Sequence, residues 1–93
     1  MTNDVKVLKL ITGEEVIARV TEEKNNLITL EKPMTLQMLP NTSTGQVGFA
    51  MVPWMKAAKN DKTTISIEHV LVTDEASDQT EKNYLQVVTG LSL

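Results

Sequence analysis

Residues 5–31 read VKVLKLITGEEVIARVTEEKNNLITLE, and this stretch decides the fold. Its apolar residues recur at every second position, which is typical of half-buried β-strands. The alternation predicts one strand over 5–11 and another over 15–22, and Gly13 suits a tight turn or bulge between them. The pair Asn25-Asn26 suits a hairpin turn before the next strand, because asparagine tolerates the left-handed conformation that short hairpin turns need.

The same alternation predicts three further strands, over 27–39, 46–55 and 63–73. Pro33 lies in the middle of the first of these, where it predicts a bend or bulge because proline cannot donate a hydrogen bond to a strand ladder. The end of the last strand is apolar on both faces, with Leu71 on one face and Val70 and Val72 on the other. We therefore expect this strand to be buried on both sides, either inside the domain or by a partner.

After Asp74 the spacing of apolar residues changes to three and four, which is typical of an amphipathic helix. The residues that set this spacing are Tyr84, Leu85, Val87, Val88 and Leu91. They predict a helix over about 76–91, with Asp74 or Ser77 as the residue that caps its start.

Five short strands and one helix in 93 residues predict a single domain that spans 1–93, with all strands within 5–73. The fold class is mostly β: a small, strongly bent five-stranded antiparallel sheet or open barrel with a C-terminal helix. An open sheet of this kind has two edges that something must cover. Pairing of those edges between identical subunits would close a ring and bury the surplus apolar surface.

Composition excludes several classes of protein. Twelve acidic residues against nine basic ones give a net charge of −3, so no diffuse positive field attracts nucleic acid or anionic lipid. The chain contains no cysteine, which excludes disulfides, thiol nucleophiles and all-cysteine metal sites. It has no apolar run long enough for a membrane span and no secretory signal, so we expect a cytoplasmic protein without membrane contact.

The sequence indicates no catalytic site, no metal site and no cofactor. It contains no glycine-rich phosphate loop, nucleophile elbow or zinc signature. The acidic pairs Glu14-Glu15 and Glu22-Glu23 do not suit acid–base catalysis, because adjacent strand residues point to opposite faces. We expect these glutamates to be exposed charges and the protein not to be an enzyme.

Two short stretches resemble motifs of the Sm-like family, which includes the bacterial Hfq branch. The first motif matches Leu10-Ile11-Thr12-Gly13, then Val16, Ala18 and Val20, and finally residues 26–31 (NLITLE). A weaker likeness to the second motif lies at residues 65–70 (ISIEHV). The resemblance covers about residues 5–73.

This resemblance implies a bent five-stranded sheet that assembles into homo-oligomeric rings of five to seven subunits. Strand four of one subunit would pair with strand five of its neighbour. The resemblance also implies binding of short single-stranded U-rich or A-rich RNA, in an RNA-chaperone or RNA-processing role. The partners expected on this basis are further copies of the chain and single-stranded RNA.

The chain departs from the family pattern at both motifs. The family hairpin usually offers an acid, a base-stacking aromatic or histidine, and an asparagine, whereas residues 22–26 (EEKNN) form a shorter hairpin without an aromatic. Glu68-His69 replaces the Arg-Gly or Lys-His of the second motif, and the predicted helix is C-terminal where the family has an N-terminal one. An alternative hypothesis is therefore a ring-shaped protein-interaction scaffold that has lost RNA binding.

Four residues are candidates for contact with RNA: Lys24, Asn25, Asn26 and His69. An amide offers a donor and an acceptor side by side and can read a base edge, a lysine can contact phosphate, and a histidine can line the pore beside a base. The residues alone leave other roles open. The asparagines suit the turn itself, the lysine suits a solvated loop, and the histidine suits a site in or near the core.

Lys56, Lys59 and Lys62 form the only basic cluster, which Asp61 interrupts. Such a run is usually a solvated loop, and the functional alternative is a peripheral patch that gathers RNA onto one face of a ring. Trp54 follows a proline at a strand end, and we expect it in the core or at a subunit interface.

Overall fold

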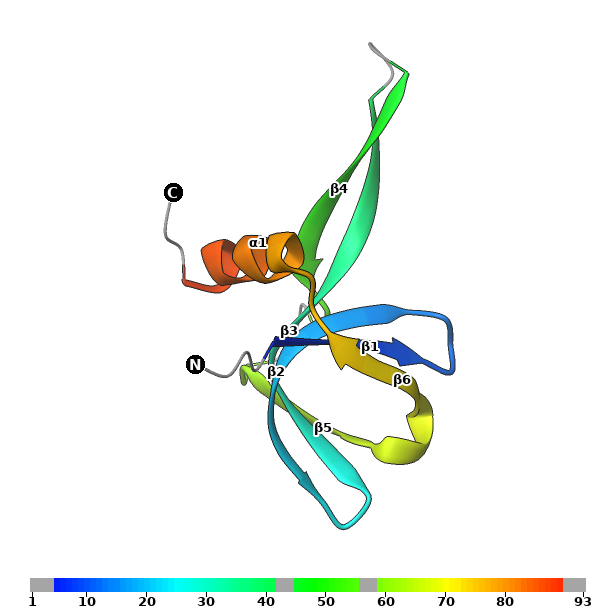
Figure 1. Ribbon diagram of the computed structural model, residues 1–93, viewed down its shortest axis with the longest axis vertical. Helices are drawn as coiled ribbons and strands as arrows, with labels where there is room; N and C mark the ends of the chain where they lie inside the picture. The colour runs from blue at the N-terminus through cyan, green and yellow to red at the C-terminus, as the bar shows by residue number, and fades with distance from the viewer. Residues whose placement is uncertain (1–4, 42–44, 56–58, 90–93) are drawn as a thin grey trace.

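The computed structural model describes residues 5–41, 45–55 and 59–89 (Figure 1). Its elements, in chain order, are β1 (Val5–Leu10), β2 (Glu15–Lys24), β3 (Leu27–Asn41), β4 (Gln46–Pro53), β5 (Lys62–Ser66), the 3-10 helix η1 (Ile67–His69), β6 (Val70–Glu75) and α1 (Asp78–Thr89). The predicted fold class is confirmed: the structure is mostly β, with an open antiparallel sheet and one C-terminal helix.

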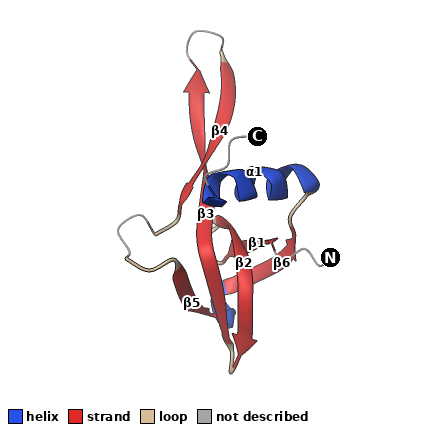
Figure 2. Cartoon of the chain, turned by 90° about the vertical axis from the view of Figure 1, so that its left-hand side faces the viewer, coloured by secondary structure: helices blue, strands red, loops and turns tan. Residues whose placement is uncertain are grey.

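The strands form one sheet in the order β4-β3-β2-β1-β6, and β5 also pairs with β3. β3 has two partners on the edge opposite β2: its residues 27–31 pair with β5 and its residues 34–41 pair with β4. Figure 2 shows the second half of β3 and β4 projecting from the body as a two-stranded ribbon. We call this ribbon, residues 34–41 and 46–53, the arm.

The change of partner along β3 takes place at the predicted bend, which is confirmed. In the register with β2, Ile17 lies opposite Met34 and Arg19 lies opposite Glu31, so β3 contains one extra residue at this point. Lys32 takes up the extra length in the left-handed region, with φ of 50°. Pro33 is buried beside it, and its carbonyl oxygen accepts a hydrogen bond of 3.0 Å from the Trp54 amide.

The bent sheet encloses one apolar core and carries a second core under α1. The first consists of Leu8, Leu10, Val16, Ala18, Ile28 and Leu30, with Val20, Trp54, Ile65 and Val70 packed against it. The second consists of Val5, Ile17, Met34, Ala76 and Tyr84. Because Val16 and Ala18 face the first core while Ile17 faces the second, β2 is buried on both faces at its centre.

α1 covers the face of the sheet at the base of the arm (Figure 1). Ser77 caps its start, as predicted, because its Oγ accepts a hydrogen bond of 3.2 Å from the Thr80 amide. Tyr84 is the buried residue of the helix, and its hydroxyl donates to the carbonyl oxygens of Glu31 at 2.9 Å and Lys32 at 3.0 Å. The helix is therefore fastened to the bulge in β3.

The predicted fifth strand, 63–73, is interrupted, so the sheet has one strand more than expected. Residues 67–69 form η1, and the Oγ of Ser66 accepts a hydrogen bond of 3.2 Å from the Glu68 amide at its start. This side-chain bond offers the backbone an alternative to the strand ladder. The expected burial of the strand end inside the domain is wrong: Leu71 is 63% and Val72 is 56% exposed in the single chain.

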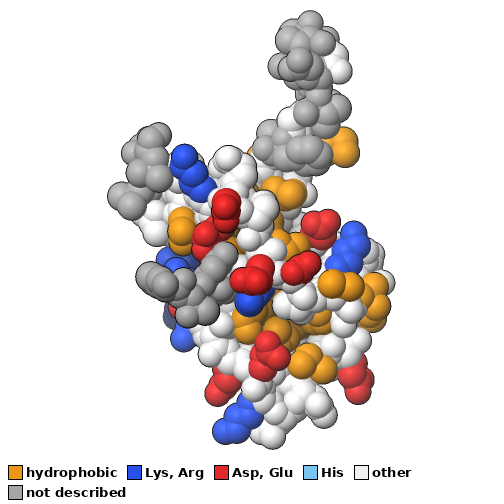
Figure 3. Space-filling view, viewed as in Figure 1, with side chains coloured by type: hydrophobic (Ala, Val, Ile, Leu, Met, Phe, Trp, Pro, Cys, Tyr) orange, Lys and Arg blue, Asp and Glu red, His pale blue; other side chains and the backbone are white. Residues whose placement is uncertain are grey.

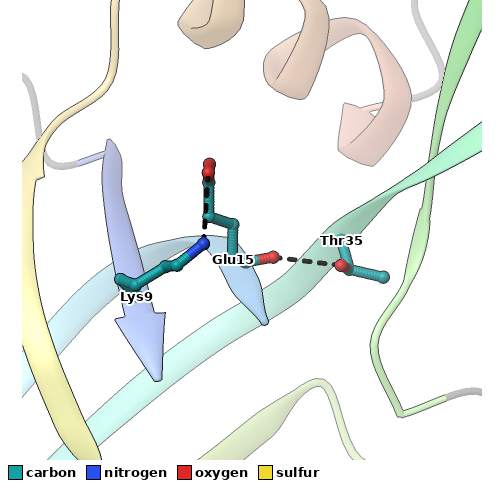
Figure 4. Close-up of polar contacts among 3 residues, drawn as sticks. All are labelled: Lys9, Glu15 and Thr35. Carbon is teal, nitrogen blue, oxygen red and sulfur yellow. Dashed lines mark hydrogen bonds and ion pairs between the residues drawn. The ribbon is translucent and has the colours of Figure 1, made fainter. Parts of the chain in front are cut away.

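A further polar contact joins the first three strands, as Figure 4 shows. The Lys9 ammonium lies 4.0 Å from the Glu15 carboxylate, and the Thr35 hydroxyl donates to the Glu15 carbonyl oxygen at 3.0 Å. Both charged side chains are about half exposed, so the ion pair contributes little to stability. Glu15 is thus an exposed charge, as predicted.

The Tyr84 hydroxyl is predicted to stabilise the fold through its two carbonyl partners. Tyr84→Phe should lower the free energy of unfolding by about 1–2 kcal/mol, because the ring still fills its site but the carbonyl oxygens lose a donor. Tyr84→Ala should cost about 3–5 kcal/mol, since it also leaves a cavity. Urea unfolding followed by circular dichroism measures both values, and equal losses for the two variants would contradict a separate role for the hydroxyl.

Burial raises the pKa of Tyr84 above its ordinary value of 10.0. A backbone hydrogen bond with Arg19 and the positive charge of Arg19 lower the pKa and partly oppose this shift. The negative charge of Glu31 raises the pKa further. In the unfolded chain the phenol ionises near pH 10, whereas the folded chain retains the proton. Its contribution to stability is therefore complete below pH 10 and is lost as the pH rises through the folded-state pKa. Since Tyr84 is the only tyrosine, the stability difference between wild type and Tyr84→Phe should shrink between pH 9 and pH 11. A difference that stays constant over this range would contradict the shift.

Candidate functional site

The turn between β2 and β3 consists of Asn25 and Asn26, as predicted. Both residues lie in the left-handed region, with φ of 55° and 65°. Two left-handed residues between paired strands make a type I′ hairpin turn, which matches the right-handed twist of the strands. Both side chains are exposed at the tip, next to the exposed Lys24 at the end of β2.

A backbone hydrogen bond joins this turn to η1. The Ile67 amide donates to the Asn26 carbonyl oxygen at 2.9 Å, directly after the pair Leu27 and Ser66 in the register of β3 with β5. η1 then leads to His69, two residues further on, whose carbonyl oxygen accepts from the Ile11 amide at 2.9 Å. The structure thus connects the asparagine turn to the element that carries His69.

The His69 side chain is exposed, so of the positions left open for it a place inside the core is excluded. In an unbroken strand over 63–73, His69 would lie on the same face as Ile65 and Ile67, but η1 breaks this alternation. His69 instead borders a pocket of about 250 Å³ at the mouth of the bent sheet. The pocket is lined by Leu10, Ile11, Thr12, Glu14, Trp54, Ile65 and His69.

Trp54 and Glu14 form the polar wall of this pocket. The indole Nε1–H donates to the Glu14 Oε2 at 3.1 Å, and the Thr12 hydroxyl donates to the Oε1 of the same carboxylate at 3.0 Å. Trp54 also packs against the first core, in agreement with the expected core position. Glu14 is exposed, as expected, but its hydrogen bond with Trp54 could not be predicted because the two residues are 40 positions apart in the chain.

The basic cluster lies away from the asparagine turn. Lys62 begins β5 and Ser66 ends it next to the turn, so the two features occupy opposite ends of this strand. Lys59 and Lys62 are exposed, and Lys56 lies outside the described residues. The structure therefore does not bring the lysine cluster together with the other candidate residues.

In the described part of the chain no helix is long and apolar enough to span a membrane. Within the same residues, no three acidic or histidine side chains converge in a way that would hold a metal ion.

A small, strongly bent antiparallel sheet with a hairpin turn joined to a short 3-10 helix and one C-terminal helix defines the class of small, open β-sheet domains. A family model for the Sm-like domain matches residues 7–85. This match spans most of the chain, and the protein belongs to the Sm-like family. A comparison with curated proteins finds no significant match.

The left-handed turn predicts opposite effects of two small residues at position 26. Asn26→Gly should leave the free energy of unfolding unchanged or raise it slightly, because glycine adopts a positive φ without strain. Asn26→Ala should lower it by about 1 kcal/mol, since an alanine Cβ disfavours this conformation. Thermal unfolding of the two variants measures the difference, and identical melting temperatures would contradict a strained position.

Proposed function

We propose that this chain forms a closed homo-oligomeric ring of five to seven subunits that binds single-stranded RNA, as an RNA-chaperone or RNA-processing protein of the Sm-like family. The RNA surface would consist of the asparagine turn, Lys24 and His69, repeated once per subunit. The proposed role is binding without catalysis, in the cytoplasm. Its partners are copies of the same chain and short U-rich or A-rich RNA.

The free edges of the sheet support the ring. β5 is paired on one side by β3 and β6 on one side by β1, so the other side of each is unpaired in the single chain. Apolar side chains accompany one of these edges: Leu71 and Val72 of β6 are more than half exposed. Figure 3 shows apolar side chains at the surface on the right-hand side of the body, where β6 and the β1–β2 turn lie. Joining β5 of one copy to β6 of the next would cover this surface and remove both edges.

One observation carries the RNA proposal: the hydrogen bond of 2.9 Å from the Ile67 amide to the Asn26 carbonyl oxygen. It connects the asparagine turn, with its exposed amides and Lys24, to η1, the element that ends in His69. The amides of Asn25 and Asn26 can read base edges, and Lys24 can contact phosphate. Each contact is weak alone, and repetition around a ring would add them along one RNA strand.

Native mass spectrometry with short oligonucleotides tests both parts of the proposal. A ring mass plus one U-rich or A-rich oligonucleotide is the expected result, and the preferred oligonucleotide identifies the base. A ring mass without a bound oligonucleotide would contradict RNA binding and still support the assembly. A monomer at all protein concentrations would overturn the ring.

The variant Asn26→Gly/His69→Ala is predicted to bind RNA at least about tenfold more weakly, because each subunit loses an amide and an imidazole. Glycine retains the turn, so this variant should still assemble. Fluorescence anisotropy of a labelled oligonucleotide gives the affinity, and emission from Trp54, the only tryptophan, reports changes beside His69.

Asn83→Ala serves as the matched control. It removes an exposed amide from α1, outside the proposed RNA surface, and should leave the affinity unchanged. Equal affinities for the double variant and wild type would contradict the assignment of these two residues.

The second candidate function is a ring-shaped scaffold that binds protein and not RNA. The observation that favours it is Glu68, an exposed acid inside η1 between Ile67 and His69. An acid at this position repels phosphate. Purified protein should decide between the two: bound RNA raises the 260/280 nm absorbance ratio and is released as salt rises, whereas a ratio typical of pure protein at low salt supports the scaffold.

A further inference from the structure

The pocket of about 250 Å³ beside the β1–β2 turn has mainly apolar walls. Of its lining residues, Leu10 is buried, and Trp54 and Ile65 are half-buried. Ile11 also lines the pocket and is 54% exposed, so apolar surface continues to its mouth. An apolar cavity of about 150 Å³ is large enough to bind benzene, so this pocket has room for one aromatic ring and a short chain.

One carboxylate lies at the mouth of this pocket. Glu14 accepts a hydrogen bond from the Trp54 indole on one oxygen and from the Thr12 hydroxyl on the other. A carboxylate has about four acceptor positions, so each oxygen can accept from one further donor. The two bonds thus orient the carboxylate and leave part of its hydrogen-bonding capacity unused.

The negative charge of Glu14 has no counter-ion, because both of its donors are neutral. Among the residues that the structure describes, the one ion pair within 4.0 Å joins Lys9 and Glu15. The described residues that line the pocket include no lysine or arginine. The pocket therefore combines apolar surface with one unpaired negative charge, and a ligand that complements both is an apolar group with a positive charge.

The pocket and the asparagine turn lie at different ends of η1. The Ile67 amide at the start of η1 donates to Asn26, whereas the His69 carbonyl oxygen at its end accepts from Ile11 of the β1–β2 turn. A nucleotide in the pocket would bring its phosphate near Glu14, without a lysine or arginine among the lining residues to neutralise it. The charge of the pocket thus favours a cation over a nucleotide.

We propose that this pocket binds a small organic cation, in which a short chain joins a primary ammonium to one aromatic or branched apolar group. The ammonium donates to the unused acceptor positions of Glu14 in a charge-assisted hydrogen bond. The apolar group lies against Trp54 and Ile65 and covers the exposed side chain of Ile11. The site goes beyond the proposed function and depends on neither the ring nor RNA.

Emission from Trp54 reports binding directly, because this residue lines the pocket and is the only tryptophan. The full chain is titrated with phenethylammonium, phenethyl alcohol and hydrocinnamate, which carry the same ring and two-carbon stem with a positive, no and a negative charge. Phenethylammonium should bind with a dissociation constant of about 1 mM or lower, and at least about tenfold more tightly than the other two compounds. Adenosine and uridine monophosphates, titrated in the same way, should leave the emission unchanged.

The variant Glu14→Gln separates the charge from the hydrogen bond. The glutamine carbonyl oxygen can still accept from the Trp54 indole, while loss of the charge should weaken binding of phenethylammonium about tenfold. Phenethyl alcohol should bind this variant and the wild type equally. Glu22→Gln, the same change at an exposed position of β2 outside the pocket, is the control and should bind like wild type.

A second variant, Ile11→Lys, tests the same charge without altering Glu14. Ile11 is exposed and lines the pocket, so a lysine at this position can pair with Glu14 and compete with the ligand. Binding of phenethylammonium should weaken at least about tenfold, whereas the apolar control Ile11→Leu should bind like wild type. Circular dichroism checks that each variant is folded.

The outcomes are distinct. A preference for the cation that is lost in Glu14→Gln and Ile11→Lys, and retained in both controls, supports the site. Equal binding of the three phenyl compounds, unchanged binding in Glu14→Gln, or constant Trp54 emission with every compound overturns the proposal. Tighter binding of a nucleotide than of the cation also overturns it. The ring and RNA binding at the asparagine turn are tested separately, by native mass spectrometry.

Discussion

The bulge at Lys32 and Pro33 is the constraint on which the rest of the structure depends. Before it β3 pairs with β5, after it β3 pairs with β4, and β2 pairs with the other edge of β3 across the bulge, from Leu27 to Thr35. The carbonyl oxygens of Glu31 and Lys32 accept hydrogen bonds from the Tyr84 hydroxyl, so the bulge also holds α1 against the sheet. One irregularity in one strand therefore positions the arm, the helix and the start of β5.

Features governed by neighbouring residues could be predicted from the sequence. Alternation predicted the strands, Pro33 the bulge, and Asn25-Asn26 the turn, because each depends on the backbone preference of the residues themselves. The 3-10 helix η1 was not predicted, although the hydrogen bond that starts it is also formed between neighbouring residues. The apolar spacing of Ile65 and Ile67 continues the strand pattern, and the Ser66 hydroxyl that ends the ladder leaves no trace in that spacing.

Contacts between distant segments account for what the sequence could not predict about the candidate site. The turn was predictable, but its connection to η1 requires the register of β3 with β5, which aligns Leu27 with Ser66. Glu14 gains its indole partner because the chain after β4 returns Trp54 to the β1–β2 turn. His69 stays a candidate, but its setting could not be predicted, because an unbroken strand over 63–73 would place it on a strand face and it lies on a 3-10 helix.

In the proposed function, residues 62–75 would connect assembly and RNA binding in one short segment. β5 and β6 each have one unpaired side in the described structure, and η1, with His69, is the link between them. In a ring, β5 would be paired on both sides and β6 likewise, so both ends of η1 would be anchored to paired strands. Ordering of this link before RNA arrives would lower the entropic cost of binding. Assembly would then do more than multiply weak contacts, because it would also fix the imidazole and the asparagine turn in the geometry that one strand of RNA meets at each subunit.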